Sequence, residues 1–511
     1  MAKLHEYQSK TLLRAAGILT PKGGMVETPG EARALATGIG GPVVVKAQVW
    51  VTGRAGRNLI RFADAPEAAT TAAEQMLGQK IGGFTIDRLL VEERLTIEQE
   101  FYLGLIIDDH ARAPVLILSA VGGSGIEEIA RQHPDQMARL VVNVGTGLRD
   151  FEARDLCRRA GISGKLLLPL STLVLQFFTT VRGCEARAAE INPLAMTAAG
   201  SLVALDARIT VDDNAVFRHP ELGIEIAREF DRPPTPLERA AWAVEKDDYR
   251  GTFYFVQMET EFHKSEGVIG FHGNGGGGAM INMDALLAHG FRIANFVDTS
   301  GNPPASKVYR AARLILSQPG IDGYFMGGSG VASQEQYHSA RGLVKAFMDA
   351  PLNVPAVIRI GGNAEEQAIA ILQRANGTFP APVEAYGRDD PPDQCVERLR
   401  ALTRDYVPSP EPAPRHTPQP AEPYQFETLT GGTVTYDHAV CRGCESKVCV
   451  ESCDPKILSL EGGVPVLNIS REEARRGGCT ECLACEVECY FLGSRGGRIM
   501  LPLPDVIGQE H

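Results

Sequence analysis

The sequence lacks three features that would indicate a nucleic-acid-binding, secreted or membrane protein. Its formal net charge is −12, so it has no excess of basic residues for a polyanionic partner. Its first ten residues are polar and charged, without the apolar core of a signal peptide. The most apolar stretch, residues 166–178, is short and contains Pro169, Ser171 and Gln176, which favours protein core over a membrane span. We therefore expect neither nucleic acid nor membrane as a partner.

Cysteine is scarce over most of the chain. Of the eleven cysteines only Cys157, Cys184 and Cys395 lie before residue 425, and they are far apart. This pattern indicates ordinary buried thiols without disulfides, and it predicts a reducing, cytoplasmic location. At 511 residues the chain is too long for one hydrophobic core, and we expect three or more domains of globular composition.

The other eight cysteines form two dense runs near the C-terminus. The runs are Cys441-Arg-Gly-Cys444-Glu-Ser-Lys-Val-Cys449-Val-Glu-Ser-Cys453 and Cys479-Thr-Glu-Cys482-Leu-Ala-Cys485-Glu-Val-Glu-Cys489. Residues 425–511 thereby resemble bacterial two-cluster ferredoxins, in which the fourth cysteine of each run binds the other cluster. The resemblance assigns one [4Fe–4S] cluster to Cys441, Cys444, Cys449 and Cys489, and the second to Cys479, Cys482, Cys485 and Cys453.

Two details depart from the ferredoxin pattern. Four residues, not two, separate Cys444 from Cys449, and no proline follows Cys489. The alternative is a pair of structural zinc sites with four cysteines each.

The N-terminal region shows alternating helix and strand signals. A helix is expected from Leu4 to Ala16, ended by Gly17. Residues 28–31, Thr-Pro-Gly-Glu, have the pattern of a capping box with proline at the first helical position. The β-branched run over residues 42–49 predicts a buried strand. Such alternation indicates an α/β domain.

Lys46 lies within this apolar strand. A buried ammonium needs an anionic partner, and phosphate oxygens would serve; a solvent-facing strand edge is the alternative. The loop that follows carries Gly53, Arg54 and Arg57, and short basic loops with glycine let backbone N–H groups approach phosphates.

Six short motifs then occur in a characteristic order. They are Leu4-His5-Glu6-Tyr7-Gln8, Val45-Lys46-Ala47-Gln48, Leu90-Val91-Glu92, Glu100-Phe-Tyr-Leu-Gly104, Glu190-Ile191-Asn192-Pro193-Leu194 and Leu205-Asp206. Over about residues 1–235 the chain resembles the ATP-grasp half of the β subunit of succinyl-CoA synthetase and its relatives, malate–CoA ligase included.

This resemblance implies a role for each matching residue. Lys46, with Gly53 and Arg54 of the loop, would contact nucleotide phosphates, and Glu92 and Glu100 would bind the adenosine part. Asn192 and Asp206 would hold Mg²⁺, an ion that prefers oxygen ligands. From the apolar pattern, Asn192 and Asp206 are expected to end neighbouring strands; capping of loops is the alternative role.

The phosphate loop departs from the family. The family sequence is Gly-Gly-Arg-Gly-Lys-Ala-Gly-Gly, of which only Gly53-Arg54 is clearly retained. ATP and GTP are therefore both open as the nucleotide.

Residues 237–405 resemble the second domain of the same subunits, a flavodoxin-like CoA-ligase domain. Asn274 matches the family position near the acyl substrate. The loops at residues 298–304 and 326–331 differ from the family, which predicts an acid other than succinate. His272 is not expected to carry phosphate, because the phosphohistidine of the family belongs to the other subunit.

The predicted fold is therefore α/β and multidomain. The domains are an ATP-grasp domain (1–236), a flavodoxin-like CoA-ligase domain (237–405), a proline-rich linker (406–424) and an α+β ferredoxin-like domain (425–511).

The predicted function is that of a β-like subunit of an NDP-forming acyl-CoA synthetase. Such enzymes use ATP or GTP and Mg²⁺ to phosphorylate a histidine of a CoA-binding α-like partner, which activates a carboxylic acid for attack by CoA. No catalytic residue is expected in this chain alone. One alternative is an electron-transfer subunit whose ATP-grasp module gates reduction of a redox partner, and another is a scaffold with structural clusters.

Overall fold

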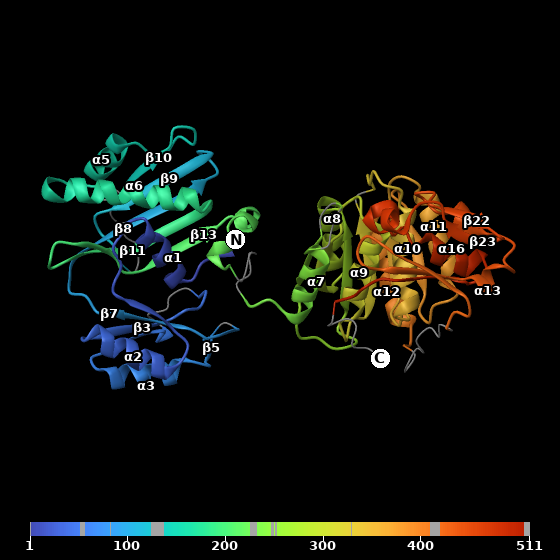
Figure 1. Ribbon diagram of the computed structural model, residues 1–511, viewed down its shortest axis with the longest axis horizontal. Helices are drawn as coiled ribbons and strands as arrows, with labels where there is room; N and C mark the ends of the chain where they lie inside the picture. Colours follow the sequence, from blue (N-terminus) through green and yellow to red (C-terminus); the bar gives the residue numbers. More distant parts are fainter. Residues whose placement is uncertain are drawn as a thin grey trace. The chain divides into compact units, whose positions relative to one another are not determined.

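The computed structural model describes residues 2–51, 57–81, 83–123, 137–224, 232–246, 250, 253–328, 330–408 and 419–504. The chain divides into two compact units, Met1–Pro234 and Thr235–His511 (Figure 1). The predicted phosphate-loop residues Gly53 and Arg54 lie outside the described residues.

Two antiparallel sheets form the framework of the first unit. In the larger sheet the strand order is β1-β13-β11-β8-β9-β10, with β12 paired to β11; the smaller sheet has the order β2-β7-β3-β4. The strands are β1 Ala2–Lys3, β2 Gly23–Val26, β3 Val43–Ala47, β4 Ile60–Ala63, β5 Lys80–Ile81, β6 Phe84–Thr85, β7 Leu89–Glu93, β8 Ile97–Asp108, β9 Ala113–Ser119, β10 Met137–Val141, β11 Ala186–Thr197, β12 Leu202–Ala204 and β13 Ala207–Val211.

Helices cover one face of each of these sheets. The smaller sheet carries α2 and α3, and the larger sheet carries α5 and α6 (Figure 1). The α-helices are α1 Glu6–Ala15, α2 Pro29–Ile39, α3 Pro66–Met76, α5 Asp150–Arg159 and α6 Leu167–Gly183. The predicted capping box is confirmed, because Thr28 accepts from the Glu31 amide and the Glu31 carboxylate accepts from the Thr28 amide.

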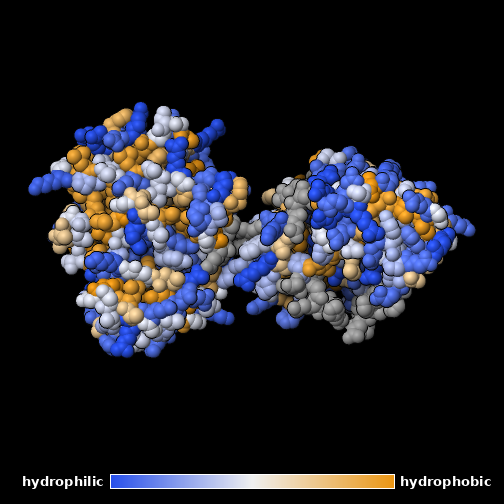
Figure 2. Space-filling model, in the orientation of Figure 1, coloured by the Kyte–Doolittle hydropathy of each residue, from blue (hydrophilic) through white to orange (hydrophobic). Residues whose placement is uncertain are grey.

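Helix α6 coincides with the most apolar stretch of the sequence. With the preceding turn it forms a segment, Gly164–Gly183, that is long and apolar enough to cross a membrane, and 39% of its most apolar window is buried. Its residues Leu170, Val174 and Phe177 pack in the core beneath the larger sheet. Apolar side chains also reach the surface over α5 and α6, among them Phe151 and Leu168 (Figure 2). A single helix of this kind is weak evidence for a membrane span, because core helices of soluble proteins have the same composition.

A doubly wound sheet forms the first part of the second unit. Its strand order is β14-β16-β15-β17-β18-β19, parallel except for β14 at one edge. The strands are β14 Tyr254–Gln257, β15 Val268–Asn274, β16 Arg292–Asp298, β17 Gly323–Gly328, β18 Ala356–Arg359 and β19 Val383–Tyr386. The helices are α7 Pro236–Lys246, α8 Gly276–Ala288, α9 Ala305–Leu316, α10 Tyr337–Asp349, α11 Glu365–Asn376 and α12 Pro392–Asp405. Ligands of such sheets bind beyond the carboxyl ends of the strands.

The cysteine-rich C-terminal segment belongs to the same compact unit. It has an antiparallel sheet of order β20-β21-β24 and a hairpin, β22-β23. Its elements are β20 Pro423–Glu427, β21 Thr433–Asp437, α13 His438–Cys441, α14 Val448–Glu451, β22 Leu458–Glu461, β23 Val464–Leu467, α15 Arg471–Glu473, α16 Ala484–Leu492 and β24 Gly497–Met500. Helix α16 contacts α10 (Figure 1), and one hydrophobic core continues from the doubly wound sheet into this segment.

Candidate functional sites

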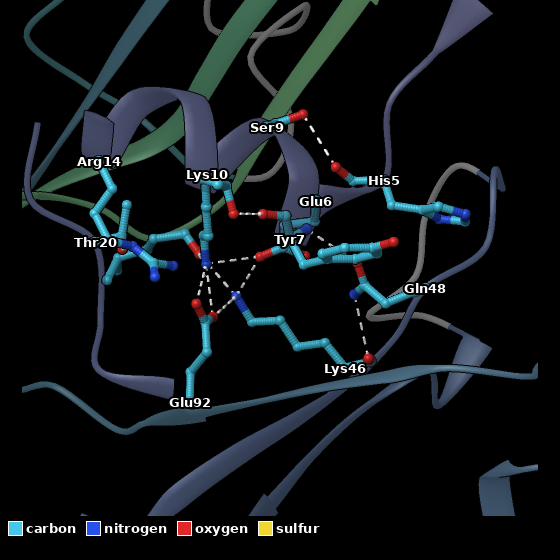
Figure 3. A network of polar contacts seen from close by, with 12 residues as sticks. His5, Glu6, Tyr7, Ser9, Lys10, Arg14, Thr20, Lys46, Gln48 and Glu92 are labelled. Atoms are coloured by element: carbon cyan, nitrogen blue, oxygen red, sulfur yellow. Dashed lines mark hydrogen bonds and ion pairs between the residues drawn. The ribbon is translucent and has the colours of Figure 1, made fainter. Parts of the chain in front are cut away.

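Lys46 lies in a buried cluster of charges in the first unit (Figure 3). Its ammonium is 2.8 Å from the Glu6 carboxylate and 3.1 Å from that of Glu92, and it donates to the Leu205 carbonyl at 2.7 Å. Lys10 lies beside it, 2.8 Å from Glu6 and 2.6 Å from Glu92, and also donates to the Leu205 carbonyl. Lys46 is therefore buried, as the apolar strand predicted, and its partners within the chain are carboxylates.

The pKa values of the two lysines in this cluster shift in opposite directions. Burial acts to lower the pKa of Lys46, but the carboxylates of Glu6, Glu92 and Asp206 outweigh it and raise that pKa above its usual value. Burial dominates at Lys10, where the pKa is lowered despite the two glutamates. Three carboxylates face two ammonium groups, so these five residues together carry one surplus negative charge.

Asn192 and Asp206, the predicted Mg²⁺ ligands, are adjacent through the backbone. The backbone N–H of Asn192 donates to the backbone carbonyl of Asp206 at 3.1 Å. The expectation that Asn192 ends a strand is wrong, because it lies within β11, where the pairing with β8 shifts register between Ile191 and Leu194. That irregularity interrupts the regular ladder at Asn192. The Asn192 Oδ1 accepts from the Gly123 amide at 2.9 Å.

Glu100 lies close to Gly123, the residue whose amide donates to Asn192. A Cβ at Gly123 would be 2.5 Å from a carboxylate oxygen of Glu100, so this glycine permits the approach. Glu100 is on β8, whereas Glu92, the other predicted adenosine contact, is on β7 and 1% exposed. The structure thus pairs Glu92 with two lysines, and the adenosine roles of Glu92 and Glu100 stay predictions.

Sequence reasoning missed Glu6 and Lys10 as members of this cluster. Both are on α1, four residues apart, where opposite charges usually form an exposed pair. The only signal was their place in and beside the motif Leu4-His5-Glu6-Tyr7-Gln8.

In the second unit, Asn274 is the last residue of β15 and is buried. Its Nδ2 donates to Gln336 Oε1 at 2.9 Å, and Gln336 Nε2 donates to the Gln334 carbonyl. This chain of amides links the end of β15 to the segment that enters α10.

His272 is enclosed two residues earlier on the same strand. Its Nδ1 lies 2.5 Å from the Tyr324 hydroxyl and its Nε2 3.3 Å from that of Thr299. Burial lowers the pKa of His272 to about 3, so the ring is neutral. That His272 does not carry phosphate stays a prediction.

Comparison with known proteins bears on these sites. The ATP-grasp domain family matches residues 3–196. The chain is 37% identical over 385 residues to the succinate–CoA ligase [GDP-forming] subunit beta of Thermus thermophilus, covering 75% of this chain and 96% of that protein. It is 38% identical over 371 residues to the [ADP-forming] subunit beta of Roseiflexus sp., covering 72% of this chain and 93% of that protein.

The chain belongs to the succinate–CoA ligase β-subunit family.

Members of this family are subunits of acid–thiol ligases. A solved structure of ATP citrate lyase from Methanothrix soehngenii in complex with citrate and coenzyme A has a similar fold, with a TM-score of 0.64 at 18% identity. That similarity covers 78% of this chain and 99% of the other. The multidomain α/β fold with an ATP-grasp domain is therefore confirmed.

The eight C-terminal cysteines of this family member form two groups. The thiol of Cys449 interacts electrostatically with Cys441, Cys444 and Cys489, and the thiol of Cys485 with Cys479, Cys482 and Cys453. We call these groups the first and second thiol sets. Burial and neighbouring thiols raise the pKa of Cys449 to about 12 and that of Cys485 well above its usual value.

The thiols of each set are near one another without converging on one point. Within the described ranges, no group of three or more His, Cys, Asp or Glu side chains is placed to hold a single metal ion.

A glycine-rich loop, residues 493–497, wraps the first thiol set. A Cβ at Gly493 would lie 3.3 Å from Cys489 Sγ, and one at Gly496 would lie 2.8 Å from Cys441 Sγ. The Gly497 amide donates to Cys489 Sγ at 3.4 Å. Burial would raise the pKa of Cys444, but hydrogen bonds from Ser446 and from the backbone of Lys447 and of this loop lower it to about 7. The loop therefore approaches sulfur where side chains would not fit.

A second buried ion network joins α10 to the cysteine-rich segment. Arg341 is 3.3 Å from Glu488 and 3.2 Å from Asp454, which follows Cys453 in the chain. Lys345 is 2.8 Å from Glu486. Burial acts to lower the pKa of Lys345, but Glu486 and the neighbouring acidic groups raise it above its usual value. The segment is thus fixed to the doubly wound sheet on the side of the second thiol set.

Proposed function

We propose that the chain is the β-like subunit of an NDP-forming acyl-CoA synthetase. The observation that carries the proposal is the Lys46 cluster, which gathers Glu6, Lys10 and Glu92 beside Asp206 in a chain of this family. The named products of its relatives include both ADP and GDP, so the substrate nucleotide is ATP or GTP.

The residues suit a nucleotide–Mg²⁺ complex. Asp206 and Asn192 supply the oxygen donors that would hold Mg²⁺, and this ion would neutralise phosphate charge when bound. Lys46 presents a fixed ammonium to the phosphates, because two glutamates keep it charged. Glu100 lies beside Gly123 and would contact the adenosine part of the nucleotide.

The carboxylic acid would bind beside Asn274, at the carboxyl ends of the strands of the doubly wound sheet. Because residues 298–304 and 326–331, at the ends of β16 and β17 and beyond, depart from the family sequence, the acid differs from succinate. Turnover with succinate measured against a panel of hydroxy, keto and aromatic acids tests this, and a preference for succinate would contradict it.

A separate CoA-binding α-like subunit completes the enzyme, and we place the complex in the cytoplasm. His272 is enclosed by Tyr324 and Thr299 and is unsuited to carry a phosphoryl group between sites. The partner would supply the phosphohistidine and the CoA site.

The test compares the purified chain with and without its co-encoded partner. The chain alone should form no acyl-CoA, and the partner should restore ADP or GDP release that depends on acid and CoA. Label from γ-³²P nucleotide should appear on the partner and be lost in acid. Acyl-CoA synthesis by this chain alone, or label on His272, would overturn the proposal.

We further propose that the cysteine-rich segment is a two-cluster ferredoxin domain. The two thiol sets support this, because each unites three cysteines of one run with the last cysteine of the other, as two-cluster ferredoxins do. The loop at residues 493–497 fits the group, since its glycines leave room beside two of the thiols. Zinc would require four sulfurs about 2.3 Å from one ion, whereas each cluster thiolate binds its own iron.

The clusters favour a second candidate function, an electron-transfer subunit in which nucleotide binding gates reduction of a partner. The shared hydrophobic core and the Arg341 and Lys345 ion pairs support it, because they fix the segment to the ligase fold. Nucleotide hydrolysis that requires a reductant, but neither acid nor CoA, would favour this function over the ligase.

A further inference from the structure

The two thiol sets differ in their access to the surface. Of the eight cysteines in the two sets, all of them described, Cys444 alone is partly exposed, and it belongs to the first set. The second set lies next to the α10 junction, where Arg341 and Asp454 both act on Cys482. Contact with an external molecule is therefore easiest at the first set.

A surface hollow of about 330 Å³ adjoins the first thiol set. Gly496 forms part of its wall, and a Cβ there would be 2.8 Å from Cys441 Sγ. Only one layer of backbone thus separates the hollow from a cysteine sulfur.

Uncharged polar side chains (Gln419, Gln425, Thr433 and Thr435) line the hollow together with cationic and apolar ones. Arg495 and Arg498 line it, and no ion pair of either guanidinium occurs among the residues that the structure describes. The lining carboxylate, Asp437, accepts from the backbone amides of Ala421, Glu422 and Ala439 and keeps its charge, so the two arginines exceed it by one positive charge. Val440 and Met500 add apolar surface, being 41% and 61% exposed.

These charges oppose the charge of the whole chain, which is −12. A local cationic surface on an anionic protein orients an acidic partner toward that one surface, while the rest of the protein repels it. Exposed apolar side chains at the same place suit a protein partner rather than a small anion.

We propose that the hollow and its rim, built around Arg495, Arg498, Val440 and Met500, are the docking surface for a small acidic protein that carries one electron at a time. The proposal rests on the ferredoxin part of the proposed function. The reduced carrier would lose one electron, and a cluster held by the first thiol set would gain it, with no bond made or broken.

The test uses the full chain with its clusters and a reduced acidic [2Fe–2S] ferredoxin as the probe, followed by stopped-flow absorbance. Reversing both charges, Arg495→Glu with Arg498→Glu, should slow reduction at least tenfold at low salt, and salt should slow the unmodified chain. Reduced methyl viologen, a small cation, should reduce the same variant no more slowly than the unmodified chain.

The matched control reverses two charges elsewhere in the segment, Arg475→Glu with Arg476→Glu, whose partner is Glu472. It should be reduced by the ferredoxin at nearly the original rate. Equal slowing of control and variant, or an unchanged rate in the variant, would overturn the docking surface.

Iron analysis and viologen reduction distinguish a failure of the proposed clusters from a failure of the proposed docking surface. A chain without iron would overturn the clusters and the docking surface together. A chain with reducible clusters and a charge-independent ferredoxin rate would overturn the docking surface alone.

Discussion

Among the described residues, the first unit contains the buried Lys46 cluster and the second unit contains the buried network of Arg341 and Lys345. In the first unit, Lys10 and Lys46 meet Glu6 and Glu92 beside Asp206, a predicted Mg²⁺ ligand. In the second, the charges of α10 meet those of α16, and the network joins two parts of the chain. Buried pairs cost desolvation energy, so neither cluster is explained by stability alone. We propose that the first prepares a ligand site, and the second joins the cysteine-rich segment to α10.

The largest expected effect comes from breaking the docking network. Arg341→Met removes the buried cation shared by Glu488 and Asp454 and leaves Glu488 with the half-buried Arg374 alone, which should cost up to roughly 3–5 kcal/mol of the stability of the second unit. Calorimetric unfolding should show this loss in one transition, with the transition of the first unit unchanged.

Two further variants control this result. Arg404→Met removes an exposed partner of Asp405 and should cost less than about 1 kcal/mol. Adding Glu488→Gln to Arg341→Met should recover part of the loss, since the stranded charge is removed. A loss of the same size in Arg404→Met would contradict the role assigned to the network.

The ligand cluster should respond in binding and turnover. Asp206→Asn removes the charge of a proposed Mg²⁺ donor, and we expect at least about a hundredfold loss of ligase turnover, or about 2.7 kcal/mol. Calorimetry should show weakened binding of Mg-nucleotide, while iron content and unfolding of the second unit stay unchanged. The control is Asp155→Asn, which removes only an exposed pair with Arg158. Unchanged nucleotide binding in Asp206→Asn would mean that this cluster is structural, like the one at α10.

His272 provides a pH test at the acid-binding edge, outside both clusters. Its folded pKa is about 3, whereas the ring titrates near 6.5 when unfolded. Between these values the unfolded state binds the extra proton, so falling pH should cost up to about 1.4 kcal/mol per pH unit. Above about pH 6.5 the histidine should contribute no pH dependence. Chemical denaturation from pH 7 to 4 should be less steep in pH for His272→Asn, and equal slopes would contradict a neutral buried ring.

The smallest expected loss of stability comes from removing a single helix cap. Thr28→Ala removes the capping hydrogen bond at α2 and should cost about 1 kcal/mol, with nucleotide binding retained. Thr28→Ser, which keeps the hydroxyl, should lie close to the original chain in thermal unfolding. A loss of stability as large as that of Arg341→Met would mean that the docking network contributes no more than a single helix cap.

Local signals in the sequence predicted much of the framework. The capping box at Thr28 and the strand around Lys46 follow from contacts between near neighbours in the chain, which local patterns record. Asn192 and Asp206 were predicted as a pair because the family places both at one ion, and a backbone hydrogen bond does bring them together.

The buried charges could not be predicted in the same way. Glu6 with Lys10 has the spacing of an exposed helical pair, and Arg341, Lys345 and Glu486 also look like surface residues. Their burial depends on segments that are distant in sequence, and no local pattern shows which segments meet. The irregularity of β11 at Asn192 has the same origin, because it lies in the pairing with β8.

The central claim is that a ligase β subunit carries two [4Fe–4S] clusters on its second unit. Metal and sulfide analysis of the chain purified without oxygen tests it most directly. The account predicts about eight iron and eight acid-labile sulfide per chain, with EPR signals after reduction. About two zinc per chain, without sulfide or an EPR signal, would contradict it.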